Sequence, residues 1–345
     1  AVAAMRLLHP EWRIGWAIEP RWRPLLEGTT EGKLTLPLVD VIHEVPTRDW
    51  NRRPVSLTTF REIMKLRREL RWEQYDLCVD MQGLFRSAVV GRLAGAAAFV
   101  GSLQPREIPA RWLYQRSIQT RAAHVIDKGC ELLGSAIGET LTAAAVPLPS
   151  DDTAERWCDE LLAATLPDST KRFVLVAPTA GWGAKCWPAE KFGAVAAMLA
   201  EAGYTVLVNA GAEDNPTASA VVEASGGRSV AVGCDLAQLT ALLRRAALVV
   251  AGDTGPLHLA AALGTPVVAL FGPTDPKRTG PYGVRSRVLR HASSVEDHRR
   301  HETPEDGLAQ ITVGEVTATA LDLLQGGGIE IQSGVQISNR PEGAA

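Results

Sequence analysis

The stretch Val249–Pro276, VVAGDTGPLHLAAALGTPVVALFGPTDP, contains two apolar, strand-like runs on either side of a short helical run. The first run ends at Asp253, Thr254 is suited to the N-cap of the helix, and Pro256 is suited to its first turn. In parallel sheets, ligands collect at the carboxyl ends of strands, where helix N-termini attract anions and most often phosphates. Gly255 allows the backbone to come close to such a ligand. The stretch therefore predicts an α/β fold with a phosphate-binding turn.

The composition indicates a folded protein of two domains. The chain has 345 residues, of which 46% are hydrophobic and 22% charged, and no apolar run approaches the roughly 18 residues of a membrane span. Its five cysteines are scattered without CxxC spacing, so neither a disulfide framework nor a metal site is predicted. We expect a soluble, cytoplasmic monomer. The net acidic C-terminal half and the lack of an aromatic platform argue against binding of nucleic acid.

Strand-like runs alternate with helical patterns throughout the chain, which is typical of parallel sheets built from βαβ units. The expected strands lie at 13–17, 41–44, 77–80, 98–101, 173–176, 204–209, 229–232, 248–251 and 267–271. The expected helices lie at 57–70, 188–202, 217–224, 236–246 and 256–263. We predict an N-terminal domain at 1–150, a C-terminal domain at 151–324, and a flexible Gly-rich tail at 325–345.

Three further polar residues follow predicted strands of the C-terminal half. Lys185 lies just before the helix that begins near Pro188, where it is suited to neutralise a diphosphate, and Glu213 follows the next strand. His258 lies in the first turn after Asp253 and is placed to donate to a phosphate oxygen. A purely structural explanation also fits, in which Asp253 is a cap, His258 a core residue, and Lys185 and Glu213 ordinary residues near helix starts.

Two motifs give a family resemblance. GDTGPLHLAAALGTPVVALFGPTDPKRTGPYG and APTAGWGAKCWPAEKF resemble glycosyltransferase family 9, the heptosyltransferases of lipopolysaccharide inner-core assembly, and the resemblance extends from Ala1 to about Leu324. It implies the GT-B architecture, in which two Rossmann-like domains face a cleft, the N-terminal one holding the acceptor and the C-terminal one the nucleotide sugar. No GxGxxG fingerprint is present, which argues against a dehydrogenase.

The resemblance also implies roles for individual residues. The donor-binding residues would be Thr179 and Lys185 at the diphosphate, Glu213 at the nucleoside, and Asp253, Thr254, Gly255 and His258 at the phosphates and sugar. Ala180 stands where the family often has a second hydroxyl, and an added Gly-Trp follows it.

The N-terminal half carries the expected acceptor site. YDLCVDMQGLFRSAVVGRLAGA resembles the group that adds a first heptose to the Kdo sugar of lipid A, and it places Gln82, Arg86 and Ser87 at a strand end facing the cleft. An anionic glycolipid also needs a cationic surface. The candidates are Arg48, Arg52, Arg53 and Arg61, with Lys65 and Arg68 on the same helix face as Arg61.

Alternatives remain open for these residues. Gln82 and Arg86 could instead cap a helix. The basic helix face with Arg61, Lys65 and Arg68 could bind the acceptor, contact an anionic membrane peripherally, or simply be solvated. Trp50 fits either a sugar contact or ordinary packing.

The implied reaction is an inverting transfer of heptose from ADP-heptose, without metal or cofactor, that needs one carboxylate as general base. AVAAMRLLHPEW begins at Ala1 as a helical pattern without a capping residue, so we expect a strand upstream of it. The resemblance implies that the catalytic Asp lies in the turn after that strand. Asp80 is the candidate base within the printed sequence. Other functions that fit are addition of the second heptose, an epimerase on the same scaffold, and a sugar-nucleotide-binding protein impaired in catalysis.

Overall fold

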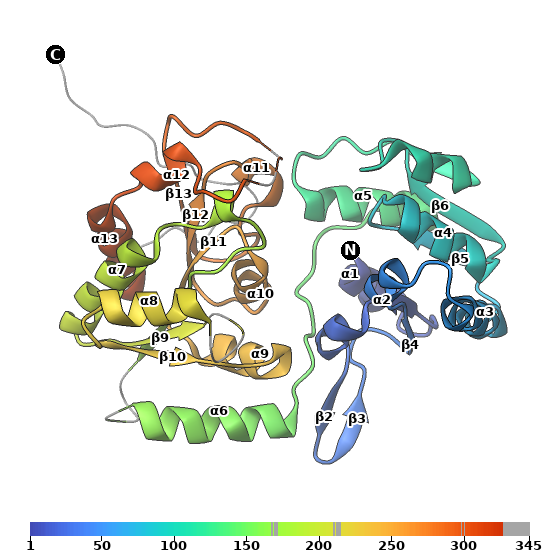
Figure 1. Cartoon of the computed structure of the whole chain (residues 1–345). Coiled ribbons are helices and arrows are strands. Elements are labelled where there is room, and N and C mark those ends of the chain that lie inside the picture. The colour runs from blue at the N-terminus through green and yellow to red at the C-terminus, as the bar shows by residue number, and fades with distance from the viewer. Residues whose placement is uncertain are drawn as a thin grey trace. The chain divides into compact units, whose positions relative to one another are not determined.

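The computed structural model describes residues 1–166, 168, 172–209, 211, 215–297, 299 and 301–326. The chain divides into an N-terminal unit, Ala1–Pro149, and a C-terminal unit that begins at Ser150. Both units have an α/β fold with parallel sheets, as Figure 1 shows for each. No helix in these described ranges combines the length and the hydropathy of a membrane-spanning segment.

The C-terminal unit is organised around a six-stranded parallel sheet with the order β10-β9-β8-β11-β12-β13. Its strands are β8 (Phe173–Ala177), β9 (Thr205–Asn209), β10 (Ser229–Val232), β11 (Leu248–Gly252), β12 (Val267–Phe271) and β13 (Ser286–Arg290). Every residue of β8, β11 and β12 is buried, because helices cover both faces of a parallel sheet.

The helices of this unit are α6 (Asp152–Thr165), η3 (Gly183–Lys185), α7 (Ala189–Glu201), α8 (Pro216–Ala224), α9 (Leu236–Arg245), α10 (Gly255–Ala262), α11 (Pro276–Thr279), α12 (Asp306–Gln310) and α13 (Val313–Leu324). Side-chain caps fix several of their starts, as when Asp235 accepts from the Gln238 amide at the start of α9. The core joins β8, β11 and β12 to α7 and α13, and its largest fully buried side chain is Trp187.

The N-terminal unit holds two separate parallel sheets and a hairpin. β1 (Gly15–Ile18) pairs with β4 (Val41–Glu44), and β5 (Leu77–Asp80), β6 (Ala98–Ser102) and β7 (Arg116–Ile118) form the three-stranded sheet. β2 (Gly28–Thr30) and β3 (Lys33–Thr35) form an antiparallel hairpin. The helices are α1 (Val2–Leu8), η1 (Pro20–Leu25), α2 (Thr47–Arg52), α3 (Leu57–Trp72), α4 (Phe85–Ala94), η2 (Ile108–Leu113) and α5 (Val125–Ile137).

All nine strands expected from the sequence are present within two residues of their predicted ends, and so are the five expected helices. The hairpin β2–β3 and the strand β7 were not predicted, because three-residue strands carry almost no alternation. β13 was also missed. Its sequence SRVLR has three polar or charged residues in five and no regular alternation, so neither strand pattern was recognisable.

Candidate functional site

The order of the C-terminal sheet reverses between β8 and β11, and this reversal places the candidate donor site. Chain order runs outward from β8 in one direction and from β11 in the other, and Ala177 pairs with Ala251 across the two strands. At such a switch point the loops after the two strands diverge and leave room for a ligand. The loops nevertheless touch at their base, because a Cβ added to Gly252 would lie 3.0 Å from the carbonyl oxygen of Lys185.

Asp253 is the centre of this site. One carboxylate oxygen lies 2.5 Å from Lys185 Nζ, and the other lies 2.9 Å from His258 Nε2. The Asp253 side chain is 6% exposed and that of Lys185 16%, whereas that of His258 is 44% exposed. Burial raises the pKa of Asp253, but hydrogen bonds from His258 and Lys185 outweigh it and bring that pKa down to about 2.

This geometry gives Asp253 a positioning role. Both of its oxygens are occupied and it stays ionised, so it holds Lys185 and His258 at the strand end. Because Nε2 of His258 faces Asp253, its Nδ1 is the ring atom left for a ligand, and Nδ1 donates to an anion only when the ring is an imidazolium. The Trp182 ring lies 5.3 Å from Lys185 Nζ and contacts it from another side.

The turn into α10 follows the predicted pattern with one difference. Thr254 occupies the N-cap position, but its hydroxyl donates to the Gly252 carbonyl and does not cap the helix. A Cβ added to Gly255 would meet no atom within 4 Å, so the start of this helix is open to a ligand. The uncapped start and its dipole favour an anion there.

The neighbouring loops complete this edge of the sheet. Thr179 is half-buried in the loop after β8, and Glu213 lies outside the described residues. Thr274, after β12, was not singled out from the sequence. Its hydroxyl is buried and has no hydrogen-bond partner in the part of the chain that the structure describes. The GPTD motif around it could have marked it as a candidate site residue in the sequence.

The N-terminal unit brings together a cationic cluster that we define as Arg21, Arg48 and Arg86. Each arginine follows the carboxyl end of a parallel strand, namely β1, β4 and β5. Burial lowers the pKa of Arg21, and the positive charges of Arg48 and Arg86 lower it further, so both of these charges repel that of Arg21. Glu19 offsets only part of this repulsion. Arg21 was missed from the sequence, although its place after a strand marked it in the same way.

Asp80, at the end of β5, is a structural residue. It is 6% exposed and accepts hydrogen bonds from the amides of Gln82 and Gly83, from Ser87 Oγ at 3.0 Å and from the Tyr114 hydroxyl at 2.7 Å. With both oxygens engaged, it is unsuited to serve as a general base. Ser87 points to this carboxylate, which corrects the expectation that it faces a cleft. The Gln82 side chain is exposed.

The remaining predicted basic residues lie on the surface of α2 and α3. Arg48, Arg52, Arg53 and Arg61 are all exposed, and Arg52 lies 3.8 Å from Asp49. Trp50 is half-buried against the core, and its Nε1 donates to Glu62. Ordinary packing is therefore the correct explanation of Trp50.

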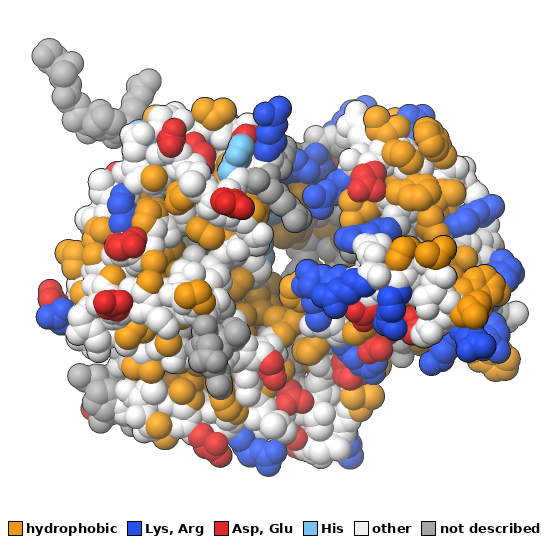
Figure 2. Space-filling model, in the orientation of Figure 1, with side chains coloured by type: hydrophobic (Ala, Val, Ile, Leu, Met, Phe, Trp, Pro, Cys, Tyr) orange, Lys and Arg blue, Asp and Glu red, His pale blue; other side chains and the backbone are white. Residues whose placement is uncertain are grey.

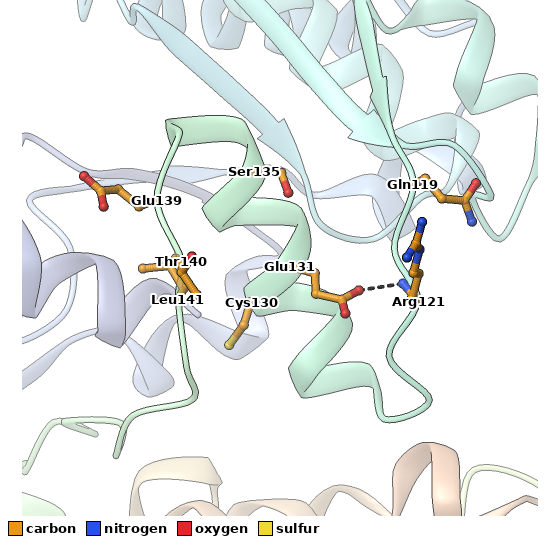
Figure 3. A pocket seen from close by; sticks show the side chains of 8 residues that line it. All are labelled: Gln119, Arg121, Cys130, Glu131, Ser135, Glu139, Thr140 and Leu141. Atoms are coloured by element: carbon orange, nitrogen blue, oxygen red, sulfur yellow. Dashed lines mark hydrogen bonds between the residues drawn. The ribbon is translucent and has the colours of Figure 1, made fainter.

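A separate cavity of 270 Å³ lies beside α5 (Figure 3). Its lining residues are Gln119, Arg121, Cys130, Glu131, Ser135, Glu139, Thr140 and Leu141. The Glu131 carboxylate accepts from the backbone amides of Arg121 and Ala122, so its charge already has partners. The cavity contains none of the predicted site residues.

Comparison with known proteins shows the family of the chain. Residues 63–309, more than half of the chain, match the profile of glycosyltransferase family 9 (heptosyltransferase). The chain belongs to glycosyltransferase family 9. It is similar to lipopolysaccharide heptosyltransferase 1 of Pseudomonas aeruginosa, at 29% identity over 81% of this chain and 75% of the relative. Heptosyltransferase 1 of Escherichia coli K12 is 27% identical over 81% and 85%, and heptosyltransferase 2 of the same strain is 25% identical over 71% and 73%.

Solved structures share the fold of this family 9 chain. An E. coli heptosyltransferase with ADP matches with a TM-score of 0.73 at 23% identity, covering 93% of both chains. A family 9 glycosyltransferase from Veillonella parvula matches with a TM-score of 0.76 at 20% identity, covering 94% of this chain and 92% of that one. The protein is a glycosyltransferase with the GT-B fold.

Proposed function

We propose that this family 9 enzyme transfers a heptose from ADP-heptose to the Kdo sugar of lipid A, in assembly of the lipopolysaccharide inner core at the cytoplasmic face of the inner membrane. One observation supports it most strongly, which is the Asp253 carboxylate holding Lys185 and His258 at the switch point of the sheet. The relatives named heptosyltransferase 1 support the choice of sugar and acceptor, and the E. coli structure with ADP supports the choice of nucleotide.

The donor diphosphate is placed at the start of α10. Lys185, which follows β8, contacts a phosphate oxygen through Nζ, and His258 presents Nδ1, the ring nitrogen that does not face Asp253, to the same group. Asp253 keeps both groups in place. Thr179, Thr254 and Gly255 lie along the same edge, and Glu213 is assigned to the nucleoside. Positive charge fixed before the reaction stabilises the charge that develops on the leaving diphosphate.

The acceptor is placed on the N-terminal unit. The Arg21, Arg48 and Arg86 cluster needs an anion to relieve its mutual repulsion, and a Kdo carboxylate or a lipid A phosphate supplies one. Gln82 lies beside Arg86 and is suited to a sugar hydroxyl. Arg52, Arg53 and Arg61 extend the positive surface toward the other phosphate of the glycolipid.

The step is a single displacement. The acceptor hydroxyl oxygen forms a bond to the anomeric carbon of heptose while the bond from that carbon to the β-phosphate oxygen breaks. The hydroxyl proton passes to a carboxylate base, and ADP leaves with the bonding electron pair. The configuration at the anomeric carbon inverts. Neither Asp80 nor Asp253 is the base, because their oxygens are already engaged.

A second candidate is transfer of the second heptose, since heptosyltransferases 2 and 3 of E. coli also match, at 25% and 26% identity. A competition assay separates the two. The protein expressed from its natural gene is given ADP-heptose with equal amounts of Kdo-lipid A and of Kdo-lipid A that already carries one heptose. Our proposal predicts that product forms from the first, and exclusive use of the second would overturn the acceptor assignment.

The matched variants are Lys185→Met and Lys33→Met. Lys185→Met removes the charge that contacts the diphosphate and keeps most of the side-chain volume, so we expect kcat/KM to fall by about 100-fold. Lys33 is an exposed lysine of the hairpin β2–β3, and its substitution should leave kcat/KM unchanged. Equal rates for the two variants would contradict the donor site.

A further inference from the structure

α4 and η2 of the N-terminal unit pack against each other through small side chains. Ala88 of α4 and Ala110 of η2 are both 0% exposed and share a small buried cluster with Phe99. The carboxylate of Glu107 accepts from the Phe85 amide at 2.7 Å, and the Glu107 amide donates to the Gly83 carbonyl. The two elements therefore form a fixed pair.

Four large apolar side chains of this pair are nevertheless exposed. Trp112 is 77% exposed and Ile108 is 70% exposed on η2, and Phe85 is 46% and Val89 37% exposed on α4. Short helices of a globular protein normally bury their large apolar residues and expose their small ones. The four exposed side chains form an apolar patch, which we define as Phe85, Val89, Ile108 and Trp112. Exposed apolar patches mark interaction surfaces.

The charges beside the patch are positive. Arg106 and Arg111 are exposed, and neither has an ion-pair partner within the described ranges of the chain. The nearest carboxylate in sequence, that of Glu107, accepts a hydrogen bond from the Phe85 amide and forms no ion pair with either arginine in the described part of the chain. Figure 2 shows apolar and basic side chains interspersed on the visible face of this unit. An apolar surface flanked by arginines without ion-pair partners is complementary to an anionic lipid bilayer, which has an apolar interior and negatively charged headgroups.

The patch adjoins the edge of the sheet that carries the cationic cluster. A Cβ added to Gly83, after β5, would lie 3.0 Å from the Arg106 amide and 3.1 Å from Pro105 Cα, after β6. The loops that carry Gln82 and Arg106 are therefore in contact. A surface that contacts a membrane through the patch would bring this edge to the lipid headgroups.

We propose that the patch of Phe85, Val89, Ile108 and Trp112, with Arg106 and Arg111, docks the enzyme on an anionic phospholipid bilayer. Trp112 and Ile108 enter the interfacial layer, where tryptophan is favoured, and the two arginines contact phosphate groups. The proposal rests on the proposed function for its biological setting, because a lipid-anchored acceptor must be reached at the membrane. Its test uses neither donor nor acceptor, so the two can fail separately.

The experiment is co-sedimentation with vesicles that contain no lipopolysaccharide. The purified protein is mixed with vesicles of phosphatidylethanolamine and phosphatidylglycerol, or with vesicles of phosphatidylcholine. We expect binding to the anionic vesicles that weakens as salt rises. Ile108→Ser with Trp112→Ser should reduce the partition coefficient at least about tenfold. Arg106→Gln with Arg111→Gln should reduce it about fivefold for each arginine.

Two comparisons keep the test specific. Trp72 is 85% exposed at the end of α3, so Trp72→Ser removes an equally exposed tryptophan from another surface and should not change binding. Circular dichroism of each variant confirms that it is folded. Equal binding to both kinds of vesicle, or an equal loss in Trp72→Ser, would overturn the proposal.

Two further outcomes would also overturn it. If Arg61→Gln with Arg68→Gln on α3 abolishes vesicle binding while the patch variants bind normally, the docking surface is α3. If light scattering shows a dimer that Ile108→Ser with Trp112→Ser converts to a monomer, the patch is occupied by a second copy of the chain.

Discussion

Asp253→Asn tests the electrostatic centre of the proposed donor site, because it removes one charge and keeps the shape of the side chain. The pKa of Asp253 falls from its ordinary 3.8 to about 2 in the folded protein. That difference corresponds to roughly 2.5 kcal/mol of folding free energy at neutral pH. Since the folded pKa is the lower one, this stability is present above pH 3.8 and is lost as the pH falls to about 2.

We therefore expect Asp253→Asn to lower the free energy of unfolding by about 2 to 3 kcal/mol at pH 7, and by much less at pH 2.5. Urea unfolding at the two pH values measures both differences. Asp322→Asn is the control, because Asp322 is 53% exposed and lies 3.6 Å from Arg287, and such a surface pair contributes at most about 1 kcal/mol.

An equal loss at pH 7 and pH 2.5 would refute the reasoning, because an effect of shape does not titrate. A loss at pH 7 no larger than that of Asp322→Asn would refute it too. The same variant should transfer heptose at least about 100-fold more slowly, since Lys185 and His258 lose the group that positions them. A normal rate would show that Asp253 does not position Lys185 and His258 for the transfer.

Three other substitutions test separate parts of the structure. Arg21→Gln should raise the KM for the acceptor about tenfold in steady-state kinetics and leave the affinity for ADP-heptose, measured by calorimetry, unchanged. An unchanged acceptor KM would show that Arg21 does not bind the acceptor. Tyr114→Phe deletes a 2.7 Å hydrogen bond to the buried carboxylate after β5, so thermal unfolding should show a loss of about 1 to 2 kcal/mol, and an unchanged Tm would be contrary to that role. Gly183→Ala places a Cβ 1.8 Å from the Glu302 carbonyl oxygen, so it should lower both the stability of the protein and its affinity for the donor. In Gly181→Ala the added Cβ meets no atom within 4 Å, so stability and donor affinity should not change. Similar behaviour of the two variants would argue against this packing.

The sequence was sufficient for five of the six strands of the C-terminal sheet, all except the edge strand β13, because strands buried on both faces are continuous apolar runs. Val267–Phe271 is such a run, and its bounds were predicted to the residue. It also predicted that Asp253, Lys185 and His258 lie together, since side chains that follow neighbouring parallel strands meet at one edge of the sheet. Asp253, Lys185 and His258 were all named in advance.

The partners of these residues could not be read from the sequence. Nothing in the spacing says that Asp253 accepts from both Lys185 and His258, because that depends on which strands are neighbours. Asp80 shows the same limit, since a strand-end Asp looks equally suited to catalysis and to structure. Its structural role becomes visible only in the fold, where the hydroxyls of Ser87 and Tyr114 donate hydrogen bonds to its carboxylate. Arg21 was missed because Arg48 and Arg86 are far from it in the sequence and come near it only in the fold.

The measurement that tests the central claim most directly is the mass of the lipid product after the protein expressed from its natural gene is incubated with ADP-heptose and Kdo-lipid A. The proposed function predicts a gain of one heptose residue with release of one ADP, and a rate about 100-fold lower for Lys185→Met. Release of ADP without any gain in the mass of Kdo-lipid A would contradict the claim that its Kdo sugar is the acceptor.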